Sequence, residues 1–269
     1  MPELPEVEAT VRYLRERVEG EIIRSVTVGW SRTVHTTCSP AEFKKKLEGA
    51  RIEELFRRGK FVGMRLHAAS PLFLYTHLRM SGSFDVVSAN SPESKHDRVI
   101  FLLGNGRTVR FNDPRKFGRM YLAPNSDLID AKAGVEPLSE DFTVAVLNSL
   151  LKSRRGRIKS VLLDQSLIAG LGNIYVDECL WKARIHPASL ACKISGPKIV
   201  ALYDAIRSTL IEAIDLAGTD FGDGVVEGGM YTPSVYGRDG EPCSRCMTLV
   251  KRLVVGQRGT HICPRCQRR

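Results

Sequence analysis

The sequence lacks any apolar run of about 18 residues or more, and its first residues do not follow the basic-then-apolar pattern of an export signal. These absences argue against a membrane-spanning helix and against secretion. No internal repeat with a period of about 20–50 residues is present, which argues against a solenoid. We therefore expect a globular, cytoplasmic protein with no membrane partner.

Acidic residues are absent from the last 27 positions, 243–269, which carry seven of the chain's 40 basic residues. A second basic cluster, KSRRGRIK at 152–159, ends at Lys159. The whole chain has a net charge of +10, and such focused charge favours a polyanionic partner. We expect both clusters, including Lys159, to face nucleic acid; the alternative is that they are solvated charged surfaces.

Apolar spacing predicts a mostly β N-terminal part. After Pro5, Val7, Val11 and Leu14 recur at helical spacing and predict an amphipathic first helix. Strand-like runs follow, and a Gly-Asn-Gly turn at 104–106 predicts a hairpin. These runs are 21–30, 51–56, 60–67, 71–87 and 98–111. Short strands in succession favour an antiparallel sandwich or barrel.

From about residue 126 the apolar spacing becomes helical, with Ser139 as a possible helix cap and a long amphipathic helix ending at Gly218. We expect an α+β multidomain protein. Its parts are a β-sandwich domain, a helical domain, a connector and a C-terminal cysteine hairpin. Their predicted bounds are 1–125, 126–220, 221–234 and 235–269.

Four cysteines, Cys243, Cys246, Cys263 and Cys266, follow the spacing C-x2-C-x16-C-x2-C. Each C-x2-C turn can bring two thiolates to one side of a tetrahedral ion, and a hairpin between the turns can complete the site. We predict one structural Zn²⁺, with a pair of disulfides as the alternative. His261 is a possible rival ligand. Cys38, Cys179 and Cys192 are expected to be ordinary buried thiols.

The amino terminus reads MPELPEVEAT. Removal of Met1 before the small Pro2 leaves a secondary amine. Such an α-amino group titrates near about 7.7–8.0, so part of it is a neutral nucleophile at physiological pH. Glu3 and Glu6 are then candidates for acid–base work at the first helical turn. The alternative is that these glutamates, with Glu8, only offset the helix dipole.

Two further segments suit phosphate. The loop between the cysteine pairs presents Arg258 beside glycines, and Asn173 follows Gly170 and Gly172 at a predicted helix start. Arginine donates paired hydrogen bonds to phosphate, and a helix start offers free N–H groups. The alternative is that the loop charges serve only solubility.

Six motifs, in order along the chain, resemble the bacterial formamidopyrimidine-DNA glycosylases. These motifs are MPELPEVEAT, HLRMSG, NDPRKFGR, LLDQSLIAGLGNIYVDECLWKARIHP, VYGRDGEPC and RGTHICPRCQ. The resemblance implies a β-sandwich, a helix–two-turn–helix domain and a zinc finger. It also implies a base-excision repair glycosylase/AP lyase, a monomer, that removes formamidopyrimidines and 8-oxoguanine from double-stranded DNA. Abasic sites would also be substrates.

The same resemblance implies roles for individual residues. Pro2 is the nucleophile that forms a Schiff base with the sugar, Glu3 the acid/base and Glu6 a supporting carboxylate, with β- and δ-elimination to follow. Phosphate contacts are implied for Lys60, His77, Asn173 and Arg258. The space left by an extruded nucleotide would be filled by Met80, Arg115 and Phe117.

The sequence departs from the family pattern at 217–234, where the segment is shorter and has alanine in place of the first expected glycine. We therefore expect 8-oxoguanine excision to be weaker, relative to formamidopyrimidines, hydantoins or abasic sites, than in relatives with a longer loop. Two alternatives stay open: a non-catalytic protein that binds damaged DNA, and endonuclease VIII-like selectivity for oxidised pyrimidines.

Overall fold

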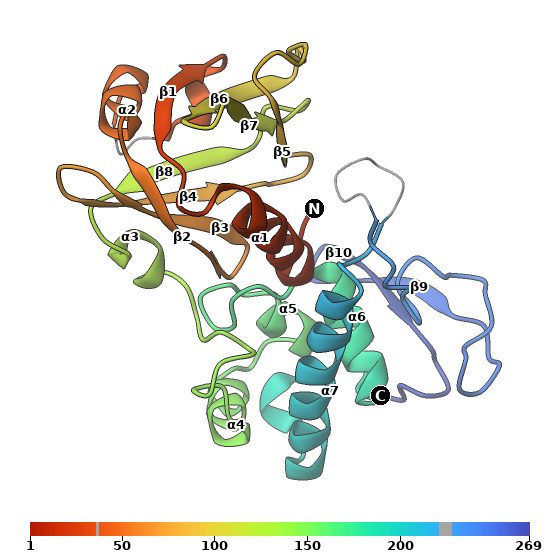
Figure 1. Ribbon diagram of the computed structural model, residues 1–269. Helices are drawn as coiled ribbons and strands as arrows, with labels where there is room; N and C mark the ends of the chain where they lie inside the picture. The colour runs from red at the N-terminus through yellow and green to blue at the C-terminus, as the bar shows by residue number, and fades with distance from the viewer. Residues whose placement is uncertain (36–37, 221–227) are drawn as a thin grey trace. The chain divides into compact units, whose positions relative to one another are not determined.

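The computed structural model describes residues 1–35, 38–220 and 228–269. The chain forms two compact units, Met1–Ala131 and Lys132–Thr219 with Met230–Arg269 (Figure 1). The first unit is mainly β-structure. The second contains helices and a short hairpin. The α+β class predicted from the sequence is confirmed, together with the N-terminal sandwich, the helical region and the C-terminal hairpin.

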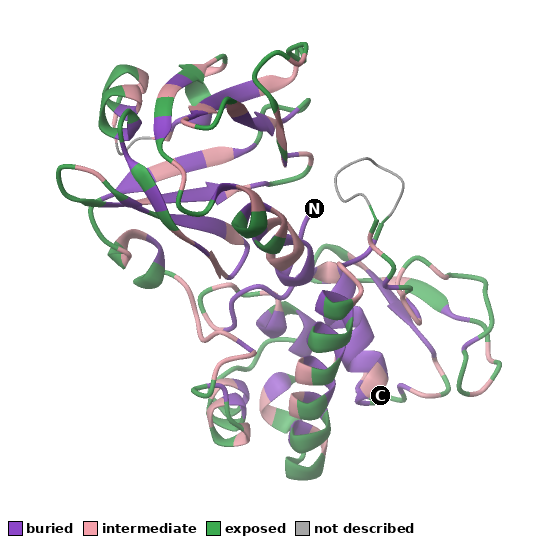
Figure 2. Cartoon of the chain, in the orientation of Figure 1, coloured by how far each residue is buried: buried purple, intermediate pink, exposed green. Residues whose placement is uncertain are grey.

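The first unit contains two four-stranded sheets in which all neighbouring strands are antiparallel. One sheet has the order β1 (Ile23–Val28), β6 (Asp97–Leu103), β7 (Arg107–Asn112), β5 (Ser83–Ser88). The other has the order β2 (Arg51–Arg58), β3 (Phe61–His67), β4 (Pro71–His77), β8 (Arg119–Ala123). Side chains such as Leu74, Phe101 and Phe111 are buried in one apolar core. Figure 2 shows the buried positions in purple along the strands of this unit. Alternation of side chains along each strand supplies this buried face.

Helix α1 (Leu4–Val18) packs on β2 and β3 through the apolar stripe of Val7, Val11 and Leu14. A second helix, α2 (Pro40–Leu47), begins at a capping box between Ser39 and Glu42. The short elements η1 (Ser31–Thr33) and α3 (Asp127–Asp130) complete the first unit.

The second unit is built around helix α6 (Asn173–Lys182), whose residues from Ile174 to Trp181 are all buried. Helix α7 (Gly196–Asp215) packs along it. The remaining elements are α4 (Val144–Lys152), α5 (Ile158–Leu162), η2 (Ala191–Lys193), β9 (Lys251–Val255) and β10 (Arg258–Ile262). None of the helices in the described part of the chain is long and apolar enough to cross a membrane.

Several local predictions were wrong. The run 71–87 is not one strand: β4 ends at His77 and β5 starts at Ser83. Thr143, rather than Ser139, caps α4, because its side chain accepts a hydrogen bond from the Val146 N–H. Helix α2 and strand β8 were missed. The hairpin turn at 104–106 is confirmed between β6 and β7.

Candidate functional site

The amino terminus is held by a reciprocal capping box. The Glu3 backbone N–H donates to Glu6 Oε2 at 2.8 Å, and the Glu3 side chain accepts from the Glu6 backbone. Pro2 is buried next to the exposed Met1, and both glutamates are 3% exposed. Glu8 does not share this arrangement, because it pairs with Arg57 at 3.1 Å. The capping box therefore fixes the peptide that joins residue 2 to the helix.

Lys60 lies in the two-residue turn between β2 and β3, and its side chain is 7% exposed. Its neighbour Phe61 pairs across β3 and β4 with His77. Burial lowers the pKa of His77 to about 3, and the charges of Arg79 and Lys60 act in the same direction. His77 Nδ1 accepts the Arg79 backbone N–H at 3.0 Å. His77 is therefore neutral, with its proton on Nε2.

Three side chains that the sequence analysis grouped stand on two loops of the first unit. Met80 lies between β4 and β5 and is 40% exposed, while Phe117 lies between β7 and β8 and is 46% exposed. The Arg115 guanidinium carbon lies 4.9 Å from the centre of the Phe117 ring. A large exposed apolar side chain on a loop lacks a packing role, which suits a residue that enters another molecule.

Lys159 was expected at the surface, but the structure shows it to be buried. It has 0% exposed area, and its Nζ lies 2.6 Å from Asp177 Oδ1 and 3.0 Å from the Gly259 carbonyl oxygen. The other cations of its cluster are exposed, as in Arg155 and Arg157. The expectation of a DNA-facing Lys159 is therefore wrong, because its ammonium is enclosed between α5, α6 and β10.

Arg258 begins β10, directly after the turn Gly256–Gln257, and is exposed. Both turn residues have positive φ, 57° and 63°, as a tight two-residue hairpin requires. A Cβ on Gly256 would collide with the Ser160 hydroxyl, so the turn packs closely on α5. Asn173 Nδ2 donates to the Gly259 carbonyl oxygen at 3.0 Å. Asn173 and Arg258 are thus brought to the same end of the hairpin.

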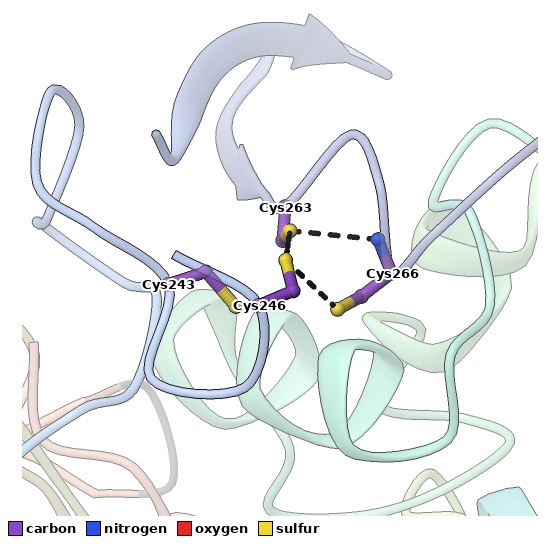
Figure 3. Close-up of side chains that lie close together, drawn as sticks. All are labelled: Cys243, Cys246, Cys263 and Cys266. Carbon is purple, nitrogen blue, oxygen red and sulfur yellow. Dashed lines mark hydrogen bonds between the residues drawn. The ribbon is translucent and has the colours of Figure 1, made fainter. Parts of the chain in front are cut away.

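The four cysteines predicted as metal ligands come together (Figure 3). Their sulfur atoms all lie within 4.8 Å of one another, with Cys246 and Cys263 at 3.4 Å and Cys246 and Cys266 at 3.6 Å. Four thiolates about 2.3 Å from one Zn²⁺ ion would be about 3.8 Å apart, so the set fits a tetrahedral zinc site. His261 is not part of it: its Nε2 lies 3.5 Å from Asp239 Oδ1.

The three other cysteines lie outside this cluster. Cys179 is buried as expected, whereas Cys38 and Cys192 are only partly buried.

Comparison with known proteins covers most of the chain. Residues 1–120 match the formamidopyrimidine-DNA glycosylase N-terminal domain, 133–223 the H2TH domain of the same enzymes, and 240–269 the zinc finger found in FPG and IleRS. The formamidopyrimidine-DNA glycosylase of Brevibacillus brevis is 44% identical, with 100% of this chain and 99% of that protein covered.

The chain belongs to the formamidopyrimidine-DNA glycosylase family. The Bacillus subtilis protein of that name is 40% identical, with 99% of each chain covered. Among solved structures, a complex between the Lactococcus lactis Fpg and an abasic site containing DNA has a TM-score of 0.91 and 35% identity, and covers 99% of this chain and 100% of that one. A similar complex contains N7-Benzyl-Fapy-dG DNA, with a TM-score of 0.91, 36% identity and full coverage of both chains.

In this member of the glycosylase family, polar contacts hold the zinc-finger segment against the helical part of the second unit. The sequence analysis did not predict these contacts. The Glu178 carboxylate accepts the backbone N–H groups of Ser234, Val235 and Tyr236 at 2.7–2.9 Å. Gln267 accepts from the Cys263 N–H and donates to the Ile185 carbonyl. The bonds to Glu178 and the bond from Gln267 to Ile185 join residues more than 50 positions apart, so local sequence pattern does not identify them, whereas the bond between Cys263 and Gln267 is local.

In this family member the segment 217–234 departs from the expected pattern, and residues 221–227 lie outside the described residues. The expected lesion preference therefore stays a prediction. The described start of the segment has one unusual feature: Ala217, where the family pattern has glycine, adopts a φ of 56° after the end of α7.

Proposed function

We propose that this chain is a base-excision DNA glycosylase and AP lyase that acts on oxidised purines in duplex DNA. Membership of the family carries this proposal, and the geometry at the amino terminus supports it. We expect the protein to act as a monomer, as the resemblance implies. Because the substrate would be chromosomal DNA, we expect it to act in the compartment that holds the chromosome.

The reaction begins once Met1 is removed. The Pro2 nitrogen attacks the sugar C1′ and loses its N–H proton, the bond to the damaged base breaks, and the base leaves with a proton supplied by the protein or water. Protonation of O4′ then breaks the C1′–O4′ bond, so that the sugar ring opens and C1′ becomes an iminium. Loss of a C2′ proton from the iminium expels the 3′ phosphate, and loss of a C4′ proton then expels the 5′ phosphate. Glu3 is the nearest carboxylate along the chain for the proton transfers, and Glu6 holds the Glu3 backbone N–H.

Each unit carries its own candidate donors for phosphate. Lys60 supplies a cation, and His77, neutral with a proton on Nε2, supplies a hydrogen bond that does not depend on pH near neutrality. In the second unit Arg258 and the start of α6 at Asn173 are the proposed contacts. We assign Lys159 a different role: it fixes the strand that begins with Arg258.

Zinc supplies no chemistry in this scheme. All four tetrahedral positions would be taken by cysteine sulfur, so the ion holds the fold of the finger and leaves no place for substrate. The residues that react with DNA stand on other elements.

The choice of lesion is a second part of the proposal. We expect formamidopyrimidines, hydantoins and abasic sites to be processed faster, relative to 8-oxoguanine, than in relatives with the longer 217–234 loop. A single-turnover comparison of these four substrates tests it. Oxidised pyrimidines belong in the same panel, because one Lactococcus lactis Fpg complex contains DNA with such a lesion.

The decisive experiment is borohydride trapping on abasic DNA. The protein is prepared with a cleavable extension before Pro2, and the same preparation is assayed before and after the extension is removed. A covalent adduct and strand cleavage that appear only after removal support the proposal, and Pro2→Gly should reduce both. If neither preparation forms an adduct but both bind DNA, the chain is a non-catalytic damage-binding protein.

A further inference from the structure

The loops at 78–82 and 113–118 of the first unit pack on the same aromatic ring. Phe111 is fully buried, and glycines from both loops approach it. A Cβ on Gly82 would lie 2.9 Å from the ring and 2.5 Å from the Leu78 carbonyl oxygen. A Cβ on Gly118 would collide with the same ring. Both loops therefore need glycine where they meet Phe111, and neither can shift toward it.

A polar connection joins the loops above this ring. The Ser81 hydroxyl donates to Asp113 Oδ1 at 2.5 Å and accepts the Arg115 backbone N–H at 3.4 Å. The second carboxylate oxygen, Oδ2, accepts the Gly118 N–H at 2.7 Å. Ser81 directly follows Met80 on the first loop, whereas Arg115 and Gly118 belong to the second loop. One serine and one carboxylate thus connect the backbone beside Met80 to the backbone of Arg115.

Asp113 is itself held from several sides and has 0% exposed area. Its N–H donates to the His96 carbonyl oxygen at 2.9 Å, and its carbonyl oxygen accepts Arg98 Nε at 2.7 Å. The carboxylate is consequently a fixed point of the β-sandwich and not a mobile surface group. Hydrogen bonds to an ionised, enclosed acceptor are stronger than neutral ones.

Each loop also contains a backbone conformation that a non-glycine residue rarely adopts. Arg79 has a φ of 60° and Lys116 a φ of 61°. Such conformations are unfavourable for a residue with a Cβ and persist where neighbouring contacts impose them. Arg79 directly precedes Met80, and Lys116 lies between Arg115 and Phe117. The loops are therefore held in shapes that set where these three exposed side chains stand.

We infer that Ser81 and Asp113 are positioning residues that fix Met80 at a set distance from Arg115 and Phe117, so that the three side chains enter the duplex as one rigid unit. This inference rests on the proposed function. It assigns to Ser81 and Asp113 no contact with the reacting atoms. Their role is to lower the cost of filling the space that an extruded nucleotide leaves, a cost that falls when the inserted groups are already ordered.

The first test is Ser81→Ala, which removes both hydrogen bonds of the hydroxyl and leaves the bond between Asp113 and Gly118. Single-turnover rates are measured on a formamidopyrimidine lesion in duplex DNA and on an abasic site in single-stranded DNA. The duplex rate should fall about tenfold, because displaced groups lose much of their effect, while the single-strand rate changes less than about twofold. Ser81→Thr, which keeps the hydroxyl, should restore the duplex rate. Ser94→Ala, which removes a hydroxyl that only accepts the local His96 N–H, is the matched control.

A second test distinguishes positioning from a general loss of structure. Ser81→Ala is combined with Met80→Ala and Phe117→Ala, and the duplex rates are compared in a thermodynamic cycle. If the serine acts through those side chains, its own tenfold effect should shrink to less than about twofold in their absence. A full tenfold effect in that background would overturn the inference.

The remaining outcomes are also decisive. Equal losses on duplex and single-stranded DNA, or an unchanged duplex rate in Ser81→Ala, contradict the positioning role. Asp113→Asn, which weakens the hydrogen bonds to Ser81 and Gly118, should also lower the duplex rate more than the single-strand rate. If this variant fails to fold, the serine variants still carry the test. A parent protein with no activity on either substrate would instead contradict the proposed function, so the two failures are told apart by the parent protein alone.

Discussion

The first unit packs a large set of apolar side chains between two sheets, whereas the segment 235–269 buries few and gathers four thiols. The apolar cluster of the finger consists of Trp181, Val235, Val250 and two of the cysteines. A segment of this size has too little core to fold alone, so a metal and polar contacts must supply the difference. The two regions therefore differ in what holds their functional groups in place.

This difference separates two ways of holding the side chains that we propose contact DNA. In the first unit Lys60 stands on the turn between β2 and β3, His77 ends β4 and Met80 stands on the loop that follows, and the core fixes the register of these strands. In the second unit Arg258 depends on the cysteine cluster and on the buried pair of Lys159 and Asp177. Loss of the metal, or of one charge of the Lys159–Asp177 pair, should therefore displace Arg258 and leave the side chains of the first unit in place.

The largest effect is expected from zinc removal. A strong chelator, or Cys246→Ser, should unfold the finger, since structural zinc contributes about 10–16 kcal/mol of binding free energy. Hydrogen exchange read by mass spectrometry should show loss of protection in β9 and β10, with protection in β3, β4 and β7 retained. Cys38→Ser is the control and should change neither. Simultaneous loss in both units would remove the distinction drawn above.

The next effect is expected from Lys159→Met. Removing one partner of a buried ion pair leaves an uncompensated charge on Asp177 and typically costs about 3–5 kcal/mol. Chemical denaturation should show this loss. The double variant with Asp177→Leu should recover only part of it, because Asp177 Oδ2 also accepts the buried His261 N–H at 2.9 Å. The exposed Lys193→Met serves as control. If the single variant is as stable as the parent, the pair does not anchor the finger.

A smaller, pH-dependent effect is expected at His77. Its pKa in the folded protein is about 3, below the ordinary value of 6.5, so between these values only the unfolded chain gains the proton. Stability from this group is thus complete above about pH 6.5 and decreases as the pH falls toward about 3. Hydrogen-exchange protection of the β4 amides at about pH 7 and about pH 5 measures this loss of stability. The loss of stability between the two pH values should be smaller in His77→Gln than in the parent protein. The exposed His67→Gln is the control, and the same loss in both variants would argue against a buried, neutral His77.

The smallest effect is expected from Ala217→Gly. The Gly218 N–H donates to the Ala213 carbonyl oxygen, and Ala217 occupies the left-handed position of this helix end. Glycine removes strain of about 1–2 kcal/mol but makes the unfolded chain more flexible, so a net gain of about 0.5–1 kcal/mol is expected. Ala201→Gly, on the exposed face of α7, should instead lose about 1 kcal/mol. A thermal melt distinguishes these signs.

Much of the fold follows from local pattern. Helix α1 was predicted because its apolar stripe and Pro5 are local signals, and the zinc site because four cysteines at fixed spacing allow few alternatives. Strand β8 and the division of 71–87 into β4 and β5 were not found, since the apolar pattern runs across the loop at 78–82. Helix α2 was missed although Ser39 and Glu42 have the spacing of a capping box.

The site shows the same limit. Glu3 and Glu6 are three residues apart, so their relation can be derived from one helical turn. Ser81 and Asp113 are 32 residues apart, and Lys159 and Asp177 come from different helices. Contacts of this kind depend on strand register and helix packing, which single-residue patterns do not determine. That is why Lys159 was predicted at the surface and found enclosed.

The central claim is that the amine of Pro2 becomes covalently joined to the deoxyribose. Peptide mapping of the borohydride-trapped complex tests it most directly. We predict that the reduced sugar is found on the tryptic peptide of residues 2–12, at its first residue. An adduct on a lysine such as Lys60, or an active preparation in which Met1 is intact, would contradict the account.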